Sequence, residues 1–193
     1  MITVAIIIFV VIVLVIAVVV YTRRQENAKR RMRTSFGPEY ARASAEYGGQ
    51  QAADRELARR SQVYGRLRLE PISTADRDFY TTYWDNIRSG FLDDPSAALS
   101  GAEQLIARLI EARGYPVDDR GEQLALLSVR HGGALASYRQ ALWVSERVRT
   151  DSTSIPTEVK REALMQYQTF LDDLLTEPGA VVPPRTRGSE ATL

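Results

Sequence analysis

The chain of 193 residues contains no cysteine and only one histidine. Without cysteine, disulfides, thiolate catalysis and cysteine-based zinc or iron–sulfur sites are excluded. The sequence also lacks a P-loop, a glycine-rich dinucleotide-binding turn and a Gly-x-Ser-x-Gly nucleophile elbow. A Glu-x-x-His pair is missing because Ser128 stands three residues before His131. The paired aspartates at 93–94, 118–119 and 172–173 match no oxygen-rich calcium loop. We therefore expect no catalytic residue, metal site or cofactor.

One long apolar run is present, at residues 2–21, and it contains no charge, glycine or proline. Twenty helical residues span about 30 Å, the thickness of the hydrocarbon core of a bilayer. Sixteen of the twenty are Ile, Leu, Val or Phe, which favours insertion by about 5–10 kcal/mol. We expect residues 1–21 to form a transmembrane signal-anchor helix that contacts the bilayer through residues 2–21.

A cleaved signal peptide is the alternative for this run, and it would make the protein secreted or extracytoplasmic. Such a peptide needs a basic segment before a shorter apolar core and a small-x-small cleavage site. The chain has only Met1 before the run, and Ala5 and Ala17 are isolated small residues within it. These mismatches favour the anchor.

A basic juxtamembrane segment follows directly at residues 22–35. It carries six of the 25 basic residues and one of the 24 acidic residues of the chain. Basic flanks tend to stay in the cytoplasm, so we expect a single-pass protein of the cell membrane with its N-terminus outside and its C-terminal domain cytoplasmic. The residues expected to contact anionic head groups are Arg23, Arg24, Lys29, Arg30, Arg31 and Arg33. The rest of the chain is net acidic, which argues against a nucleic-acid partner.

Beyond the basic segment, apolar residues recur at helical spacing and no alternating strand pattern occurs. One helix is expected over residues 73–90, and the next is expected to begin at Asp94-Pro95 and end at Gly114. A third helical region, at about residues 119–149, should break or bend at Gly132-Gly133, and a last helix begins near Pro156. The aromatic residues expected in the core are Phe79, Tyr83, Trp84, Trp143 and Tyr167.

These patterns predict an all-α protein with an N-terminal transmembrane helix, a helical stalk and a small soluble helix bundle. The stalk is expected at residues 36–70, because this stretch is weakly amphipathic and is interrupted at Gly48-Gly49. The bundle covers residues 71–177. Residues 178–193 have no apolar period and are expected to be a disordered tail.

Several short segments resemble those of a known group of proteins. They are Phe36-Gly37-Pro38-Glu39-Tyr40, Trp84, Phe91-Leu92-Asp93-Asp94-Pro95, Arg113-Gly114-Tyr115-Pro116-Val117, Leu127-Ser128-Val129-Arg130-His131, Tyr138-Arg139 and Thr157-Glu158. In this order they resemble a family of uncharacterised bacterial single-pass membrane proteins, common in actinobacteria and often labelled "membrane" or "secreted" protein. Members often have Gln at the position of Arg88 and Pro at that of Gly132. The resemblance implies the architecture and leaves the function open.

The single histidine, His131, lies on the apolar stripe of its helix. We expect it to be a core or inter-helix histidine that is held by one hydrogen bond. The alternative is a site for an anion or a partner carboxylate, built from Tyr115, Arg130, His131 and Arg139.

A strong membrane anchor joined to a helix bundle without a recognisable catalytic motif indicates a protein-interaction module. Such a module would be an adaptor or scaffold at the cytoplasmic face of the membrane. Its protein partner is not identified by the sequence. Tethering would raise the local concentration of the module near membrane partners. Two alternatives stay open: a lipid- or amphiphile-binding bundle with an internal cavity, and an enzyme with a site near His131.

Overall fold

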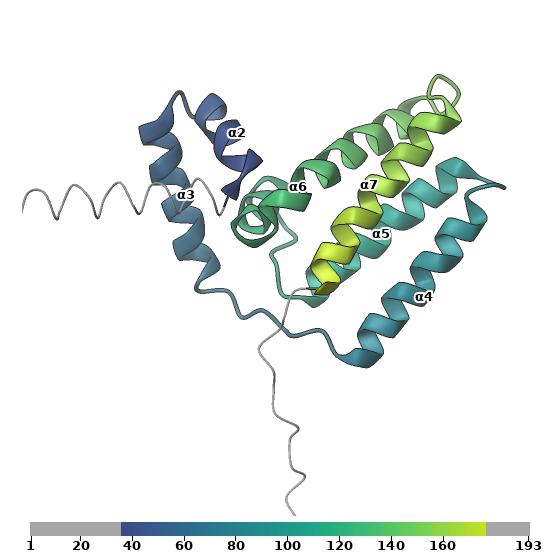
Figure 1. The fold of residues 1–193 in the computed structure, drawn as a ribbon, viewed down its shortest axis with the longest axis horizontal. Coiled ribbons are helices and arrows are strands. Elements are labelled where there is room, and N and C mark those ends of the chain that lie inside the picture. The colour runs from purple at the N-terminus through teal and green to yellow at the C-terminus, as the bar shows by residue number, and fades with distance from the viewer. Residues whose placement is uncertain (1–35, 177–193) are drawn as a thin grey trace, which may run out of the picture.

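The computed structural model describes residues 36–176, whose arrangement is shown in Figure 1. The helices of this part are α2 (Pro38–Glu46), α3 (Gln50–Tyr64), α4 (Thr74–Gly90), α5 (Pro95–Ala112), α6 (Arg120–Thr150) and α7 (Thr157–Thr176). Six helices and no strand are found in these residues, which confirms the all-α fold class. α4 packs on α5, α5 packs on α7, and α7 runs antiparallel to the second half of α6.

Residues 38–64 form a helical hairpin that packs on α6, whereas the sequence predicts a solvated stalk for residues 36–70. Gly48 and Gly49 make the turn with φ angles of 76° and 132°, a region that glycine enters without strain. The buried residues of the hairpin form a cluster that Val129 of α6 helps to cover: Phe36, Tyr40, Ala43, Ala53 and Leu57. The stalk prediction is wrong because two of these five are alanines, so the apolar signal is weak, and because the surface that covers them lies far along the chain.

Side-chain caps begin α4 and α5 at the predicted residues. The Ser73 hydroxyl accepts the N–H of Asp76, and the Asp76 carboxylate accepts the N–H of Ser73. Asp94 accepts the N–H groups of Ser96 and Ala97, both at 2.9 Å. These bonds satisfy helix N–H groups that have no partner within the first turn.

Gly114 ends α5 in the left-handed conformation, with φ 88°. A Cβ at this position would lie 2.7 Å from the carbonyl oxygen of Arg68. The segment between α3 and α4 therefore crosses the end of α5 at a distance that only glycine allows.

α6 is two helical segments joined by a sharp bend. His131 has non-helical angles (φ −105°, ψ 20°), one residue before the predicted break at Gly132-Gly133. The carboxylate of Glu103 on α5 contacts both Arg120 and Arg149. In a straight helix these two residues would be about 44 Å apart, too far for both side chains to reach one carboxylate. In Figure 1 the first segment is seen nearly end-on, and the second runs beside α7.

The main core lies between α4, α5, α6 and α7. At its centre the rings of Tyr138 and Phe170 stack at 4.3 Å, and the Tyr167 hydroxyl lies 2.8 Å from Ser145 Oγ. Its buried members include Trp84, Leu99, Ile106, Leu109, Leu127, Leu135, Tyr138, Tyr167, Phe170 and Leu174. The four helices thus share one continuous apolar interior.

Between residues 36 and 176, no helix is both long and apolar enough to cross a membrane. The predicted anchor at residues 1–21, the basic segment at residues 22–35 and the predicted tail at residues 178–193 lie outside the described residues. They stay predictions.

Candidate functional site

His131 lies in the core at the bend of α6, with 2% of its surface exposed. Its Nδ1 is 2.6 Å from Oδ2 of Asp173 on α7. The imidazole stands between Phe170, with ring centroids 6.0 Å apart, and Tyr115, at 6.3 Å. His131 is therefore a buried histidine that forms a hydrogen bond between two helices. Its contact with Asp173 joins α6 to α7.

The other two members of the predicted anion site lie elsewhere. Arg139 points toward α2, where its Nε and Nη2 donate to the two carboxylate oxygens of Glu39 at 3.3 and 3.2 Å. Arg130 is exposed at the surface of α6. The structure brings His131 and Tyr115 together inside the core and assigns Arg139 to the interface with α2. The four residues do not form one cleft, so the geometry gives no support to an enzyme site around His131.

A polar groove of about 650 Å³ runs between α5 and α6. Glu103 lies in its wall and accepts hydrogen bonds from Arg120 Nη2 at 3.2 Å and Arg149 Nη1 at 2.8 Å. Burial raises the pKa of the neighbouring Tyr138 hydroxyl, although the Arg120 cation opposes this. The phenol therefore stays protonated at neutral pH. The chemistry of this groove is that of an ion-pair clamp which holds the two segments of α6 on α5.

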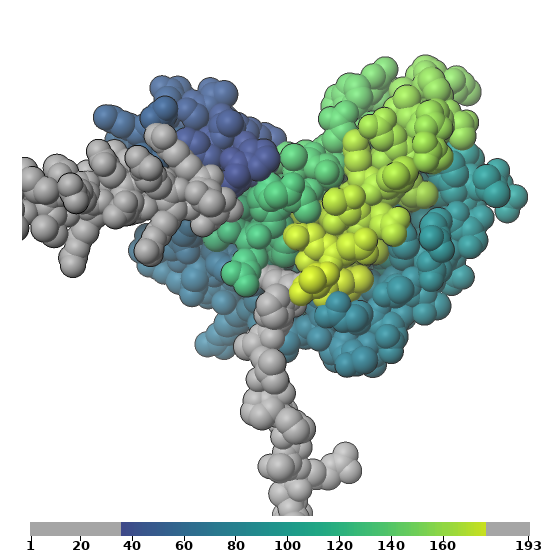
Figure 2. Space-filling model, in the orientation of Figure 1, coloured from purple at the N-terminus to yellow at the C-terminus, as the bar shows by residue number. Residues whose placement is uncertain are grey.

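A second groove, of about 470 Å³, lies between α2 and the second segment of α6. In Figure 2 it is the notch between the purple α2 and the green part of α6. Its lining residues are Pro38, Glu39, Arg42, Ala136, Arg139, Gln140 and Trp143. The guanidinium of Arg147 lies 4.7 Å from the centroid of the Trp143 ring. An exposed tryptophan and arginines thus meet at one edge of the molecule.

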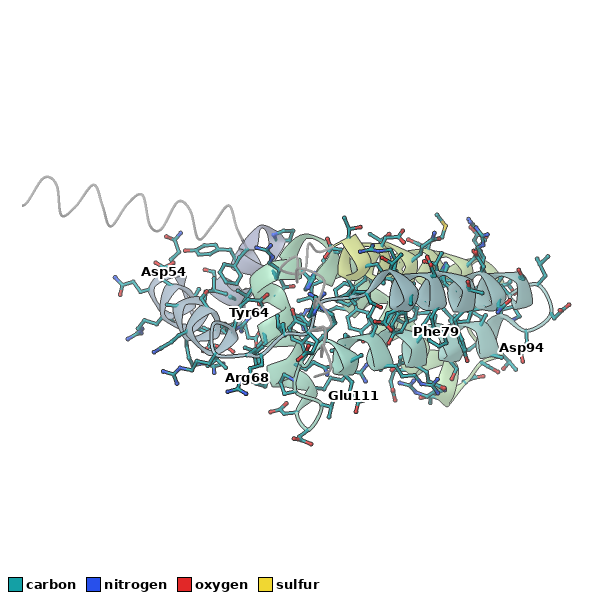
Figure 3. All side chains as sticks on the ribbon, turned by 90° about the horizontal axis from the view of Figure 1, so that it is seen from below. Asp54, Tyr64, Arg68, Phe79, Asp94 and Glu111 are labelled. Carbon is teal, nitrogen blue, oxygen red and sulfur yellow. The ribbon has the colours of Figure 1, made fainter. Side chains whose placement is uncertain are left out.

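The outer face of α4 is aromatic. Phe79 and Tyr83, four residues apart, are 54% and 40% exposed, and their ring centroids are 6.0 Å apart. They line a shallow groove of about 450 Å³ with Ala75, Asp78, Thr82 and Asn86. Phe79 is labelled midway along α4 in Figure 3.

Three of the five aromatic residues expected in the core are therefore exposed. Trp84 and Tyr167 are buried, whereas Phe79, Tyr83 and Trp143 are not. α4 lies at the edge of the bundle and packs mainly on α5, which covers only part of its wide aromatic face. Trp143 directly follows Leu142, so its spacing could have indicated its exposure. Leu142 is the last residue of the apolar stripe that the sequence predicts for α6, which consists of Leu124, Leu127, His131, Leu135, Tyr138 and Leu142.

The residues that sequence reasoning missed are the charged partners across helices. Glu39 and Glu103 are 2% and 9% exposed, and each binds arginine from α6. No spacing rule connects residues that are this far apart in the chain. In the described part of the chain, no group of three or more metal-ligating side chains is arranged to hold a metal ion.

Comparison with protein-family models, with curated proteins and with solved structures finds no match for this chain. The function must therefore be inferred from the residues of the chain itself.

Proposed function

We propose that this protein is an adaptor, tethered to the membrane by residues 2–21, that binds another protein through the outer face of α4. The observation that supports this most directly is the exposed pair Phe79 and Tyr83 on adjacent turns of an edge helix. Large aromatic side chains contribute much of the binding energy at protein interfaces. Phe79 and Tyr83 are not members of the buried core, so their surface is available to a partner.

The inner face of the same helix determines which way its outer face points. Tyr80 and Trp84 are buried against the core, which fixes the rotation of α4. The capping box at Ser73 and Asp76 holds its first turn. Phe79 and Tyr83 therefore lie on a fixed side of an ordered helix, so a partner does not have to order the backbone that carries them.

The groove also indicates the chemistry of the partner. Its floor is aromatic, and its rim carries the carboxylate of Asp78 with the polar Thr82 and Asn86. A complementary segment carries an aliphatic or aromatic side chain for the floor and a basic residue opposite Asp78.

The membrane part of the proposal comes from the sequence. Residues 1–21 would span the bilayer, the six basic residues of the segment at 22–35 would contact anionic head groups, and residues 36–176 would face the cytoplasm. The resemblance to the bacterial single-pass family agrees with a single membrane span and stays a prediction. None of the three grooves described above is the internal cavity that the lipid-binding alternative requires, because each of them opens at the surface.

Photo-crosslinking in cells tests the proposed interface. A photoreactive amino acid is placed at Phe79 in the full chain, and at Met165 on α7 as a control that is equally exposed (55%). We expect a discrete crosslinked protein from position 79 and none from position 165. The same products at both positions would contradict the α4 interface.

A second experiment measures the energetic role of the aromatic pair. Substitution of Phe79→Ser together with Tyr83→Ser should weaken capture of the crosslinked partner at least about tenfold, since interface hot spots contribute 2 kcal/mol or more. The thermal melt should change little, because neither side chain belongs to the buried core. A reporter fused to the C-terminus tests the topology independently, and reporter activity outside the cytoplasm would overturn the membrane part alone.

A further inference from the structure

The groove between α2 and α6 combines two guanidinium groups with an exposed indole. Arg42 and Arg139 line it from α2 and α6, and Trp143 forms its edge. Trp143 is 55% exposed, whereas the only other tryptophan, Trp84, is 4% exposed. An indole ring in this position is amphipathic, with an apolar body and one N–H donor, and tryptophan is enriched where proteins meet the interface of a bilayer with water.

The lining of the groove carries two guanidinium groups, Arg42 and Arg139, and one buried carboxylate, Glu39. Arg139 forms an ion pair with Glu39, so these two charges cancel and the excess positive charge of the lining is that of Arg42. Arg42 is half-exposed, and its Nε reaches Glu46 only at 3.5 Å. Burial lowers the pKa of Arg139, and the nearby cations of Arg42 and Arg60 lower it further against the opposing effect of Glu39.

Arg147 adds a third cation to this edge, because its guanidinium lies over the Trp143 ring. The neighbouring carboxylate of Glu146 is bonded to Arg149 instead. A phosphate group matches such a set of donors, since guanidinium groups bind its oxygens through charge-assisted hydrogen bonds.

The position of the groove in the chain brings it near a bilayer. Pro38, in its wall, follows the last residue of the apolar run, Tyr21, by 17 residues. A fully extended segment of this length spans at most about 60 Å, so the groove stays within that distance of the membrane and meets lipid at a high effective concentration. This step rests on the proposed anchor, whereas the contacts in the groove do not.

We propose that the groove between α2 and α6 binds the head group of an anionic phospholipid, with Arg42 on the phosphate and Trp143 in the interfacial layer. Binding there orients the domain on the membrane. α4 lies at the other end of the molecule from α2 (Figures 1 and 3), so its aromatic face stays accessible to a protein partner.

Tryptophan fluorescence tests the proposal on the full chain in nanodiscs. One set of discs contains phosphatidylcholine alone, and the other also contains phosphatidylglycerol; in both sets the lipid tails carry bromine as a quencher. Trp143→Phe measures the signal of the buried Trp84, which is subtracted. We expect the emission of Trp143 to shift to the blue and to be quenched only in the anionic discs.

Substitutions separate the groove from the basic segment at residues 22–35. Arg42→Gln should lower the docked population about fivefold, as expected for one basic residue at an anionic surface. Arg55→Gln removes the same charge from the exposed surface of α3, outside the groove, and should leave the quenching unchanged. Equal quenching in both kinds of disc, or equal effects of the two substitutions, would overturn the proposal.

Two further measurements identify the source of the phosphate and distinguish failure of the groove proposal from failure of the proposed anchor. A shift of Trp143 emission on addition of glycerol 3-phosphate to phosphatidylcholine discs would show a site for a free phosphate ester and would overturn the lipid assignment. If the chain does not enter discs, the anchor is refuted, and the same comparison with added vesicles decides the groove. Loss of crosslinking at α4 has no bearing on either outcome.

Discussion

Two adjacent glycines at the bend of α6, Gly132 and Gly133, have different surroundings, and alanine should therefore have opposite effects at the two positions. A Cβ on Gly132 would lie 2.9 Å from the carbonyl oxygen of Phe36 and 3.4 Å from its carbonyl carbon. A Cβ on Gly133 would have no neighbour within 4 Å. Gly132 is thus the place where the backbone just before the α2–α3 hairpin contacts α6.

The magnitudes follow from these contacts. In Gly132→Ala the backbone at Phe36 must move by several tenths of an ångström, and overpacking of this kind costs about 1–3 kcal/mol. The higher helix propensity of alanine returns about 1 kcal/mol, so the net effect is a loss of up to about 2 kcal/mol. Gly133→Ala has no steric term and should gain about 0.5–1 kcal/mol.

Thermal unfolding of the full chain in detergent, followed by circular dichroism, measures the difference. About 2 kcal/mol between the variants corresponds to a separation of about 4–8 °C in Tm for a chain of this size. Hydrogen exchange should show faster exchange in α2 and α3 for Gly132→Ala only. Equal Tm values with equal protection of the hairpin would refute the idea that α2–α3 docks on α6 through Gly132.

Three other predictions follow from single side chains. Glu103→Gln weakens both ion pairs that hold the bent α6 on α5. In chemical denaturation it should lower the free energy of unfolding by about 1–3 kcal/mol. Glu111 is exposed on the same helix, so the control Glu111→Gln should change this free energy by less than about 0.5 kcal/mol. The hydrogen bond from Arg59 lowers the pKa of Glu56 from its ordinary 4.5 to about 2. The contribution of the Glu56 carboxylate to the free energy of unfolding is therefore complete above about pH 4.5 and is lost as the pH falls toward 2. An acid titration should bring the stabilities of Glu56→Gln and the wild type together. A difference in stability that widens in acid would contradict this. Asp94→Ala removes the cap of α5 and should cost about 1 kcal/mol in the same denaturation assay.

Much of the helical layout can be predicted from local sequence. The capping box at Ser73, the Asp94-Pro95 start and the Gly114 end are all determined by bonds within one turn, and each is present in the structure. The burial of His131 follows in the same way from its place on an apolar stripe. Local rules succeed here because the groups that they concern are adjacent in the chain.

The candidate surfaces could not be predicted in the same way. Whether Phe79 and Tyr83 are buried depends on how much of α4 is covered by α5, and no periodicity within α4 contains that information. The sequence therefore predicts that Phe79 and Tyr83 are buried, whereas the structure places them in the groove on α4.

The ion pairs between helices could not be predicted from local sequence either. Glu39 lies exactly 100 residues before its partner Arg139, and Glu103 binds arginines from both ends of α6. By itself the sequence determined the helices, their caps and the apolar run that predicts an anchor, because these depend on neighbours in the chain. Only the tertiary structure decided the docking of the α2–α3 hairpin, the packing of the two segments of α6 on α5 and the grooves, because these arise where distant segments meet.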